Sequence, residues 1–219
     1  MLWVSALAGD FGRQEEPLRA TRYARLVGDG PVLGKWRNRR GAFLATRFPD
    51  RQIEHVDVYE GAQRIATRSF AADGRPRAAV DWVGRSVTLY TEPVLEVDFA
   101  EWSELELDGL LFWAPPLAER DGVWTGPGIA IAHQAASDPF SADFSVALAA
   151  GCGCEIEARM TRWIAGLPAA HYRLQRPGST ADVVALPVAD GLLVLTAAGP
   201  DLSSLGPLRA MMATARKAP

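Results

Sequence analysis

The sequence predicts an α+β fold, a predominantly antiparallel β-meander with a C-terminal helix packed on a smaller antiparallel sheet. Two observations support this prediction. Between residues 53 and 97, short runs of alternating apolar and polar residues are separated by turns that contain glycine, as in antiparallel strands with one buried face. After residue 166, turn residues separate further apolar runs, and one amphipathic segment that is typical of a helix follows.

The N-terminal residues leave two cellular compartments open. Ala6-Leu7-Ala8 has the small-x-small form of a signal-peptidase site, but no basic residue precedes it and the apolar run is short. We therefore expect a first strand and a cytoplasmic protein as the sequence is written, and export if the true start codon lies upstream. The next residues predict either a short helix that begins near Pro17 or a strand at Tyr23–Val27.

Four alternating runs within the meander are expected to form strands. Gly61, Gly74 and Gly84 lie in the turns between them, and we expect these glycines to adopt the positive φ angles of tight hairpins. The expected strands are Val56–Tyr59, Ile65–Phe70, Val80–Trp82 and Val87–Tyr90.

Residues 92–108 are strongly acidic and contain no basic side chain. Within them, Glu96 and Asp98 stand two positions apart on an expected strand, so that both carboxylates project from the same face. Such a pair either takes part in a site, as acid–base groups or as ligands of a hard cation, or covers a solvated face or a guarded sheet edge. No calcium-loop motif accompanies these acids, and we expect no metal and no cofactor.

The densest apolar run, Gly109–Ala114, is followed by two prolines. Because proline cannot donate to a sheet ladder, this pattern predicts a buried strand that ends at Pro115, and a lobe boundary near residue 116. The predicted organisation is a β-meander lobe at 1–116 and a smaller α+β lobe at 117–219. The alternative is one continuous domain.

Beyond residue 116, the residues from Ile129 to His133 predict a strand. Ser141 or Asp143 is suited to cap a short helix, although the alternation of the following apolar residues also fits a strand. The segment Glu155–Ile164 has apolar residues at helical spacing, which predicts a helix that Gly166 ends. Three strands, at 170–175, 182–188 and 192–196, and a helix that begins near Pro207 complete the chain.

Two segments resemble known families. Gly166-Leu167-Pro168-Ala169-Ala170-His171-Tyr172 leads into a hairpin, the apolar run 191–198 follows, and a helix with Met211-Met212 comes last. This order resembles the C-terminal half of the PsbP-like and DcrB-like α+β fold, which implies a binding or assembly role in the bacterial envelope or in secretion. Residues 53–92, with Tyr59-Glu60-Gly61 and Asp73-Gly74, are similar to the β-hairpin units of YD-type and MORN-type repeats.

Composition excludes several classes of function. The net charge of −3 and the pI near 5.7 argue against a general nucleic-acid binder, and no apolar run approaches the roughly 20 residues of a membrane span. Arginine far outnumbers lysine, which occurs only at Lys35 and Lys217, and this bias indicates a GC-rich bacterial gene. Cys152 and Cys154 are too few for a disulfide framework, and we expect free thiols.

The candidate site residues fall into three groups. An acid–base site would use His133 or His171 with Glu96 or Asp98. Exposed tryptophans form typical binding platforms, and a basic cluster near residue 38 is either a solvated hairpin tip or a site for an anion or a partner. The candidate ligand-binding residues are Trp82, Trp102, Trp113, Arg37, Arg39 and Arg40.

The sequence therefore favours a non-enzymatic binding or interaction protein of a bacterium, of the envelope, secretion-accessory or immunity type. A protein partner or a small ligand is expected, and nucleic acid is not; the sequence does not determine the oligomeric state. The alternative is a small hydrolase or lyase with a His/carboxylate site between the lobes.

Overall fold

The computed structural model describes residues 24–25, 33–37, 42–47, 53–60, 63–71, 75–135 and 138–218. The chain divides into two compact units, residues 1–91 and residues 92–219. The sequence placed the boundary near residue 116 instead, but Leu110 and Phe112 before that point pack into the core of the second unit. The features expected at Ala6–Ala8 and near Pro17 lie outside the described residues.

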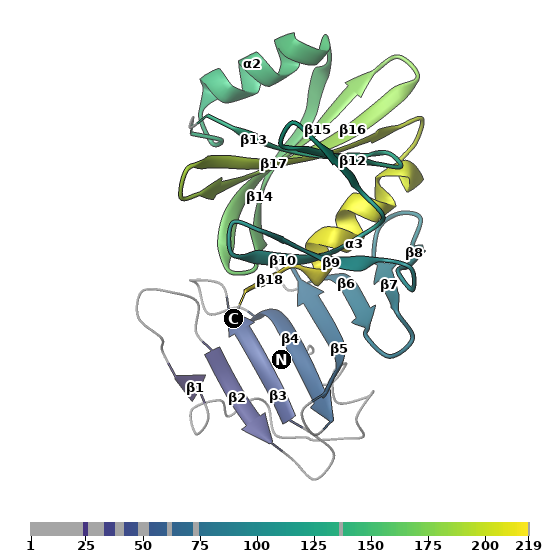
Figure 1. The fold of residues 1–219 in the computed structure, drawn as a ribbon, viewed down its shortest axis with the longest axis vertical. Helices are drawn as coiled ribbons and strands as arrows, with labels where there is room; N and C mark the ends of the chain where they lie inside the picture. Colours follow the sequence, from purple (N-terminus) through teal and green to yellow (C-terminus); the bar gives the residue numbers. More distant parts are fainter. Residues whose placement is uncertain are drawn as a thin grey trace. The chain divides into compact units, whose positions relative to one another are not determined.

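In the first unit, seven antiparallel strands follow one another across a sheet in the order of the chain (Figure 1). This arrangement confirms the predicted antiparallel meander between residues 53 and 91. The strands are β1 (Ala24–Arg25), β2 (Leu33–Arg37), β3 (Ala42–Arg47), β4 (Ile53–Glu60), β5 (Gln63–Phe70), β6 (Pro76–Asp81) and β7 (Ser86–Leu89).

The turn between β6 and β7 differs from the prediction in its backbone. Arg85, and not Gly84, has the positive φ, of 52°. Oδ1 of Asp81 accepts hydrogen bonds from the backbone N–H groups of Val83 and Gly84, at 3.0 and 2.8 Å. A Cβ atom on Gly84 would lie 2.6 Å from Oδ2 of Asp81, so a larger residue at this position would displace the Asp81 carboxylate. Gly61 and Gly74 lie outside the described residues.

The second unit contains a seven-stranded antiparallel sheet with the strand order β11-β12-β13-β17-β16-β15-β14 and a three-stranded sheet with the order β18-β10-β9. Among the described residues, this C-terminal sheet, expected to be the smaller one, has one strand fewer than the eight-stranded sheet that begins with β1. Strand β8 (Leu95–Asp98) belongs to neither of these two sheets. Their strands are β9 (Ser103–Leu107), β10 (Leu110–Ala114), β11 (Ala118–Arg120), β12 (Val123–Gly126), β13 (Ile129–Gln134), β14 (Glu155–Ile164), β15 (Leu167–Arg176), β16 (Ser179–Val188), β17 (Gly191–Gly199) and β18 (Arg216–Lys217).

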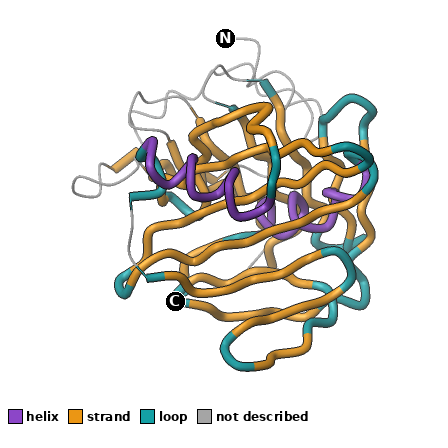
Figure 2. The backbone as a smooth tube through the Cα atoms, turned by 90° about the horizontal axis from the view of Figure 1, so that it is seen from above, coloured by secondary structure: helices purple, strands orange, loops and turns teal. Residues whose placement is uncertain are grey.

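Two α-helices lie on opposite faces of the seven-stranded sheet: α2 (Ala142–Cys152) on one side, and α3 (Gly206–Thr214) with the β9–β10 hairpin on the other (Figures 1 and 2). The one-turn 3₁₀ helix η2 (Ser203–Leu205) precedes α3. Mostly antiparallel sheets with few helices confirm an α+β fold. Neither α-helix in the described part of the chain is long and apolar enough to cross a membrane.

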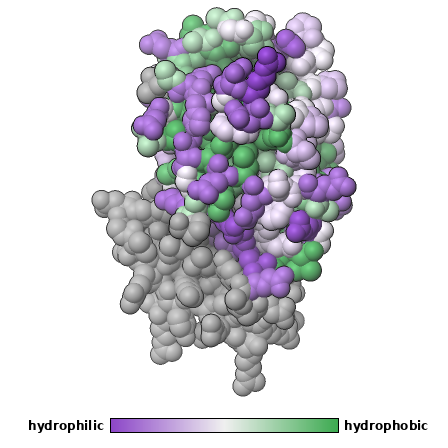
Figure 3. All heavy atoms as spheres, in the orientation of Figure 1, coloured by the Kyte–Doolittle hydropathy of each residue, from purple (hydrophilic) through white to green (hydrophobic). Residues whose placement is uncertain are grey.

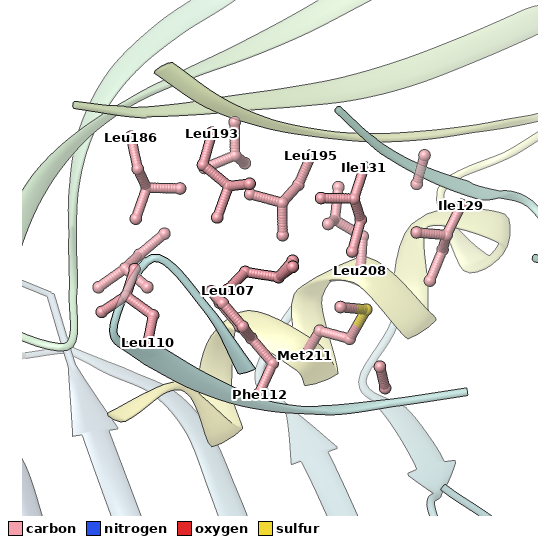
Figure 4. Packing of buried hydrophobic residues seen from close by; sticks show 14 of the residues in the cluster. Leu107, Leu110, Phe112, Ile129, Ile131, Leu186, Leu193, Leu195, Leu208 and Met211 are labelled. Atoms are coloured by element: carbon pink, nitrogen blue, oxygen red, sulfur yellow. The ribbon is translucent and has the colours of Figure 1, made fainter. Parts of the chain in front are cut away.

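The main core of the second unit lies between the seven-stranded sheet and the layer of α3 and the β9–β10 hairpin (Figure 4). Leu195 and Ile131 from the sheet, Phe112 from the hairpin, and Leu208 and Met211 from α3 are all less than 2% exposed. A second cluster covers the opposite face of the sheet, where Phe144 of α2 packs against Tyr172. The sheet is therefore buried on both faces, which explains its nearly continuous apolar runs.

The segment Glu155–Ile164 is strand β14, so the predicted helix was wrong. Its residues pair with β15 from Glu155 opposite Gln175 to Ile164 opposite Leu167. The two-residue turn Ala165-Gly166, with φ angles of 52° and 79°, joins the two strands, as in a type I′ hairpin. The pairing of ten-residue strands outweighs the local helical spacing of four apolar side chains, and Gly166 turns a hairpin where it was expected to end a helix.

Both helix starts agree with the expected capping. Ser141 is the N-cap of α2, and its side chain accepts a hydrogen bond from the N–H of Phe144 at 3.1 Å. The strand alternative for this segment is thereby excluded. Pro207 stands in the first turn of α3, where its missing N–H costs nothing.

Candidate functional site

Strands β15 and β16 place charged side chains on the face of the sheet that α3 covers. Arg173 pairs with Asp182 across the ladder, and His171 pairs with Val184. Because side chains alternate along a strand, these three polar groups share a face with Val184, which lies in the main core. Helix α3 adds Arg209 and β14 adds a further arginine. We call this group the Asp182 cluster, comprising Arg162, His171, Arg173, Asp182 and Arg209.

Asp182 lies at the centre of the cluster and is completely buried. Arg209 approaches its Oδ2 with Nε at 2.9 Å and Nη2 at 2.8 Å, and Arg173 donates from Nε to Oδ1 at 3.1 Å. Burial alone would raise the pKa of the Asp182 carboxyl, but His171 and the two guanidinium groups hold that pKa well below its usual range. The carboxylate stays charged and joins the sheet to α3.

His171 is 1% exposed, and both of its ring nitrogens face a polar group. Nε of Arg162 donates to Nδ1 at 3.0 Å, and Nε2 lies 3.2 Å from Oδ2 of Asp182. An accepting Nδ1 leaves the imidazole neutral with its proton on Nε2. Burial lowers the pKa of His171, and Arg162 and Arg209 lower it further, against the opposing effect of Asp182. The ring therefore holds one proton between fixed partners.

His133 lies in a different place, on β13 beside the turn of the β9–β10 hairpin. Its Nε2 is 2.5 Å from Oδ2 of Asp108, and its ring meets Trp124 edge-on at a centroid distance of 6.0 Å. The side chain is 45% exposed. The two-residue turn Asp108-Gly109, with φ angles of 51° and 72°, places the carboxylate there. The structure thus pairs each of these two histidines with an aspartate that the sequence analysis did not assign to it.

Glu96 and Asp98 are exposed on β8, and neither contacts a histidine among the described residues. Oδ1 of Asp98 accepts a hydrogen bond from the N–H of Ala100 at 2.8 Å. Leu95 and Val97, between these acids, lie on the side of β8 that faces Gly206 at the start of α3. The carboxylates therefore cover the outer face of β8, as in the solvated-face interpretation.

Trp82 belongs to a polar network within the first unit. Its Nε1 donates to Oγ1 of Thr67 at 2.8 Å, and that hydroxyl donates to Oδ1 of buried Asp57 at 2.5 Å. The guanidinium of Arg64 lies 3.9 Å from the centre of the Trp82 ring and 3.5 Å from Asp57. His55 is 3.9 Å from the same carboxylate, and burial lowers its pKa. One ring face of Trp82 is thus occupied by a cation.

Trp102 and Trp113 come together around Phe99 in the second unit. Their rings are 6.2 and 5.7 Å from the Phe99 ring, at tilted angles. Phe99 is 1% exposed and both tryptophans are half-buried, so the trio is an aromatic cluster with partly accessible rims. Of the predicted basic residues, Arg39 and Arg40 lie outside the described residues, and Arg37 is described only as the last residue of β2.

The surface of the second unit shows no extensive apolar area on the face drawn in Figure 3, where hydrophilic and hydrophobic residues are interspersed. Large exposed hydrophobic side chains occur singly, as at Val94 and Val146. Over the described part of the chain, no three His, Cys, Asp or Glu side chains gather as a metal site. Cys152 and Cys154, expected as free thiols, are bonded to each other.

The sequence analysis named His171 but missed the other four members of the Asp182 cluster. A signal for Asp182 exists: it is the only charged residue between Thr180 and Val188, in a segment predicted to be a buried strand. A buried carboxylate requires a charged or hydrogen-bonding partner. Many arginines in the sequence could be that partner. Only the strand register and the position of α3 show that Arg173 and Arg209 pair with Asp182.

No protein-family model matches the chain, and no curated protein matches it. Among solved structures, a chain from Bacteroides thetaiotaomicron VPI-5482 is 16% identical, with a TM-score of 0.27. The match covers 62% of this chain and 46% of that one, so this chain corresponds to less than half of the other's length. At this TM-score we draw nothing from the likeness about fold or function.

Proposed function

We propose that this protein is a non-enzymatic binding or interaction protein of a bacterium, of the envelope, secretion-accessory or immunity type. The observation that carries the proposal is the state of His171. Its Nδ1 accepts from Arg162, its Nε2 faces Asp182, and its ring is 1% exposed. A general base needs a lone pair within reach of a substrate proton, and His171 offers none.

The remaining acid–base candidates support the same proposal because they do not converge. His133 contacts Asp108, whereas Glu96 and Asp98 lie on the exposed side of β8. The resemblance of this segment to PsbP-like and DcrB-like domains, proposed from the sequence, also supports a binding or assembly role. The partner is a protein or a small ligand.

The test combines a ligand screen with an activity panel on the full chain. Thermal shift against sugars, nucleotides and small acids is expected to give saturable stabilisation by mass action. The same compounds, together with ester, phosphoester and glycoside substrates, are expected to give no product. Turnover that disappears in His133→Ala and persists in Gln134→Ala, an exposed neighbour on the same strand, would overturn the proposal.

A second candidate function, a small hydrolase or lyase, is favoured by the pair of His133 and Asp108. The pair is accessible, and a carboxylate on one ring nitrogen orients the imidazole for proton transfer at the other. Asp108→Asn tests this alternative, because it keeps the shape of the turn and removes the charge. For an enzyme, kcat would fall with a changed pH profile in both Asp108→Asn and His133→Ala. For a binding protein, both variants would give the same zero rate as the wild type.

A further inference from the structure

We propose that Cys152 and Cys154 form a site for reversible thiol–disulfide exchange with an external dithiol, and that the second unit stays folded in both redox states. The two sulfurs are bonded to each other in the structure. This redox site goes beyond the proposed function and does not depend on it. Three features of the pair support it: the short loop that the bond closes, the open approach to the sulfurs, and the acceptors that the reduced thiols meet.

The disulfide closes a very short loop. Only Gly153 lies between the two cysteines, whose Cα atoms are 5.2 Å apart. A disulfide stabilises a fold mainly by restricting the unfolded chain, and this effect grows with the length of the closed loop. The end of α2 is also held by the backbone, because the N–H groups of Gly153 and Cys154 both donate to the carbonyl oxygen of Ala149. The bond therefore adds little stability, and a structural role does not account for it.

The sulfurs lie where a solute can approach them. Both cysteines are half-buried at the rim of the core cluster that contains Phe144. Gly151 and Gly153, on either side of Cys152, are exposed, and a Cβ atom built on either one meets no atom of the described chain within 4 Å. Access of the attacking thiolate is one of the factors that decide whether a disulfide exchanges. The open space beside Cys152 meets this requirement.

The same backbone accommodates the reduced pair. Sγ of Cys152 lies 3.6 Å from the carbonyl oxygen of Ala149, and Sγ of Cys154 lies 3.5 Å from the carbonyl oxygen of Cys152. A thiol is a weak hydrogen-bond donor, so each reduced sulfur has an acceptor in place. Reduction therefore requires no rearrangement of the helix end, and the pair can pass between its two states within one fold.

The exchange proceeds in two steps. A thiolate of the external dithiol attacks one sulfur of the pair, the bond between Cys152 and Cys154 breaks, and the displaced sulfur takes up a proton. The second thiol of the reductant then attacks the mixed disulfide, releases the other cysteine as a thiol and closes its own disulfide. Two electrons and two protons pass to the pair, and the external dithiol is oxidised.

The test is a redox titration of the full chain at neutral pH with mixtures of reduced and oxidised dithiothreitol. Free thiols are trapped by alkylation and counted by mass spectrometry of the intact chain. Both disulfides in this equilibrium are intramolecular, so the ratio of reduced to oxidised protein should change tenfold for each tenfold change in the dithiothreitol ratio. Hydrogen exchange of the α2 amides should be the same in both redox states, since the backbone holds the helix end.

Variants separate a redox site from a structural bond. Cys152→Ser and Cys154→Ser each leave one thiol, and the variant that forms the mixed disulfide with oxidised glutathione faster identifies the more accessible sulfur. The double variant Cys152→Ser/Cys154→Ser is the control without thiols. Its urea midpoint should lie close to that of the oxidised wild type, whereas Leu208→Ala, which truncates a completely buried side chain, should lower the midpoint clearly.

Three results would overturn the inference. Two alkylated thiols after incubation with oxidised dithiothreitol alone would show that the pair does not form the bond. A disulfide that is reduced only after urea unfolds the chain would show that no thiol reaches it in the folded protein. A double variant that loses as much stability as Leu208→Ala, or faster exchange of the α2 amides on reduction, would assign the bond a structural role. None of these results bears on the proposed function, which fails only if turnover is measured.

Discussion

Asp182→Asn is expected to destabilise the second unit strongly. The substitution keeps the shape of the side chain and removes the only negative charge of the Asp182 cluster. Arg209, 9% exposed, then remains buried without a counter-charge. Removal of one partner from a buried ion pair typically costs about 3–5 kcal/mol. Arg173 adds little to this loss, because its 21% exposed side chain turns to solvent, and exposed pairs contribute at most about 1 kcal/mol.

The assay is urea unfolding at pH 7 followed by far-ultraviolet circular dichroism, with hydrogen exchange of the β15 and β16 amides to assign the effect to the second unit. Asp190→Asn is the matched control, since Asp190 is an exposed aspartate in the turn that follows β16. A loss of about 3–5 kcal/mol is a large share of the 5–15 kcal/mol that stabilises a typical domain, so the variant should show a clearly lower urea midpoint.

A double-mutant cycle with Arg209→Met makes the test sharper. Arg209→Met alone leaves Asp182 with Arg173 and His171, so we expect a smaller loss than for Asp182→Asn. The double variant removes both charges, and it should be more stable than the sum of the two single losses implies. Strictly additive losses, or equal stabilities of Asp182→Asn and Asp190→Asn, would refute the ion-pair explanation of this cluster.

Three further predictions concern other parts of the chain. Burial holds the pKa of His171 below 6.5, so the unfolded chain binds a proton that the folded chain does not. The stability that this group contributes is complete above about pH 6.5 and falls by up to about 1.4 kcal/mol per pH unit below it. Urea unfolding of His171→Asn should therefore depend less on pH between 7.5 and 5.5 than that of the wild type, whereas equal slopes would contradict the pKa shift. Leu208→Ala truncates a completely buried side chain and should lower the free energy of unfolding by about 2–5 kcal/mol. Val146→Ala, at an exposed helix position, should leave the urea midpoint nearly unchanged. Similar losses in the two variants would contradict the burial of Leu208 in the core. Gly84→Ala should displace the Asp81 carboxylate, which accepts hydrogen bonds from the N–H groups of Val83 and Gly84. The stability of the first unit should fall by about 1–2 kcal/mol. Gly151→Ala is the control that should not destabilise, because a Cβ atom there meets no atom within 4 Å.

Local patterns in the sequence were sufficient where the structure is itself local. The alternation between residues 53 and 91 corresponds to strands β4 to β7, because each strand pairs with its neighbour in the chain across a short turn. Ser141 caps α2 and Pro207 stands in the first turn of α3, since a helix start depends on a few adjacent residues. The antiparallel α+β class followed from these elements.

The candidate site could be predicted only in part, because its members are far apart in the sequence. His171 was named as a titratable group, but its acid was expected among the carboxylates of 92–108. Asp182 is buried next to it through the register of β15 and β16, and Arg209 arrives from α3. His133 is paired with Asp108 by the β9–β10 hairpin. Composition and residue spacing do not predict such pairings.

The sequence by itself determined the antiparallel meander, the strands of the C-terminal hairpins and the first turns of the helices, because neighbouring residues decide alternation, turn chemistry and capping. Only the tertiary structure decided that Glu155–Ile164 is a strand, that the first compact unit ends at Thr91, and that Asp182 is the centre of a buried charged cluster. The physical reason is the same in all three cases. Long-range pairing and burial contribute more free energy than the local preferences of a ten-residue segment, and they join residues whose separation in the chain carries no signal.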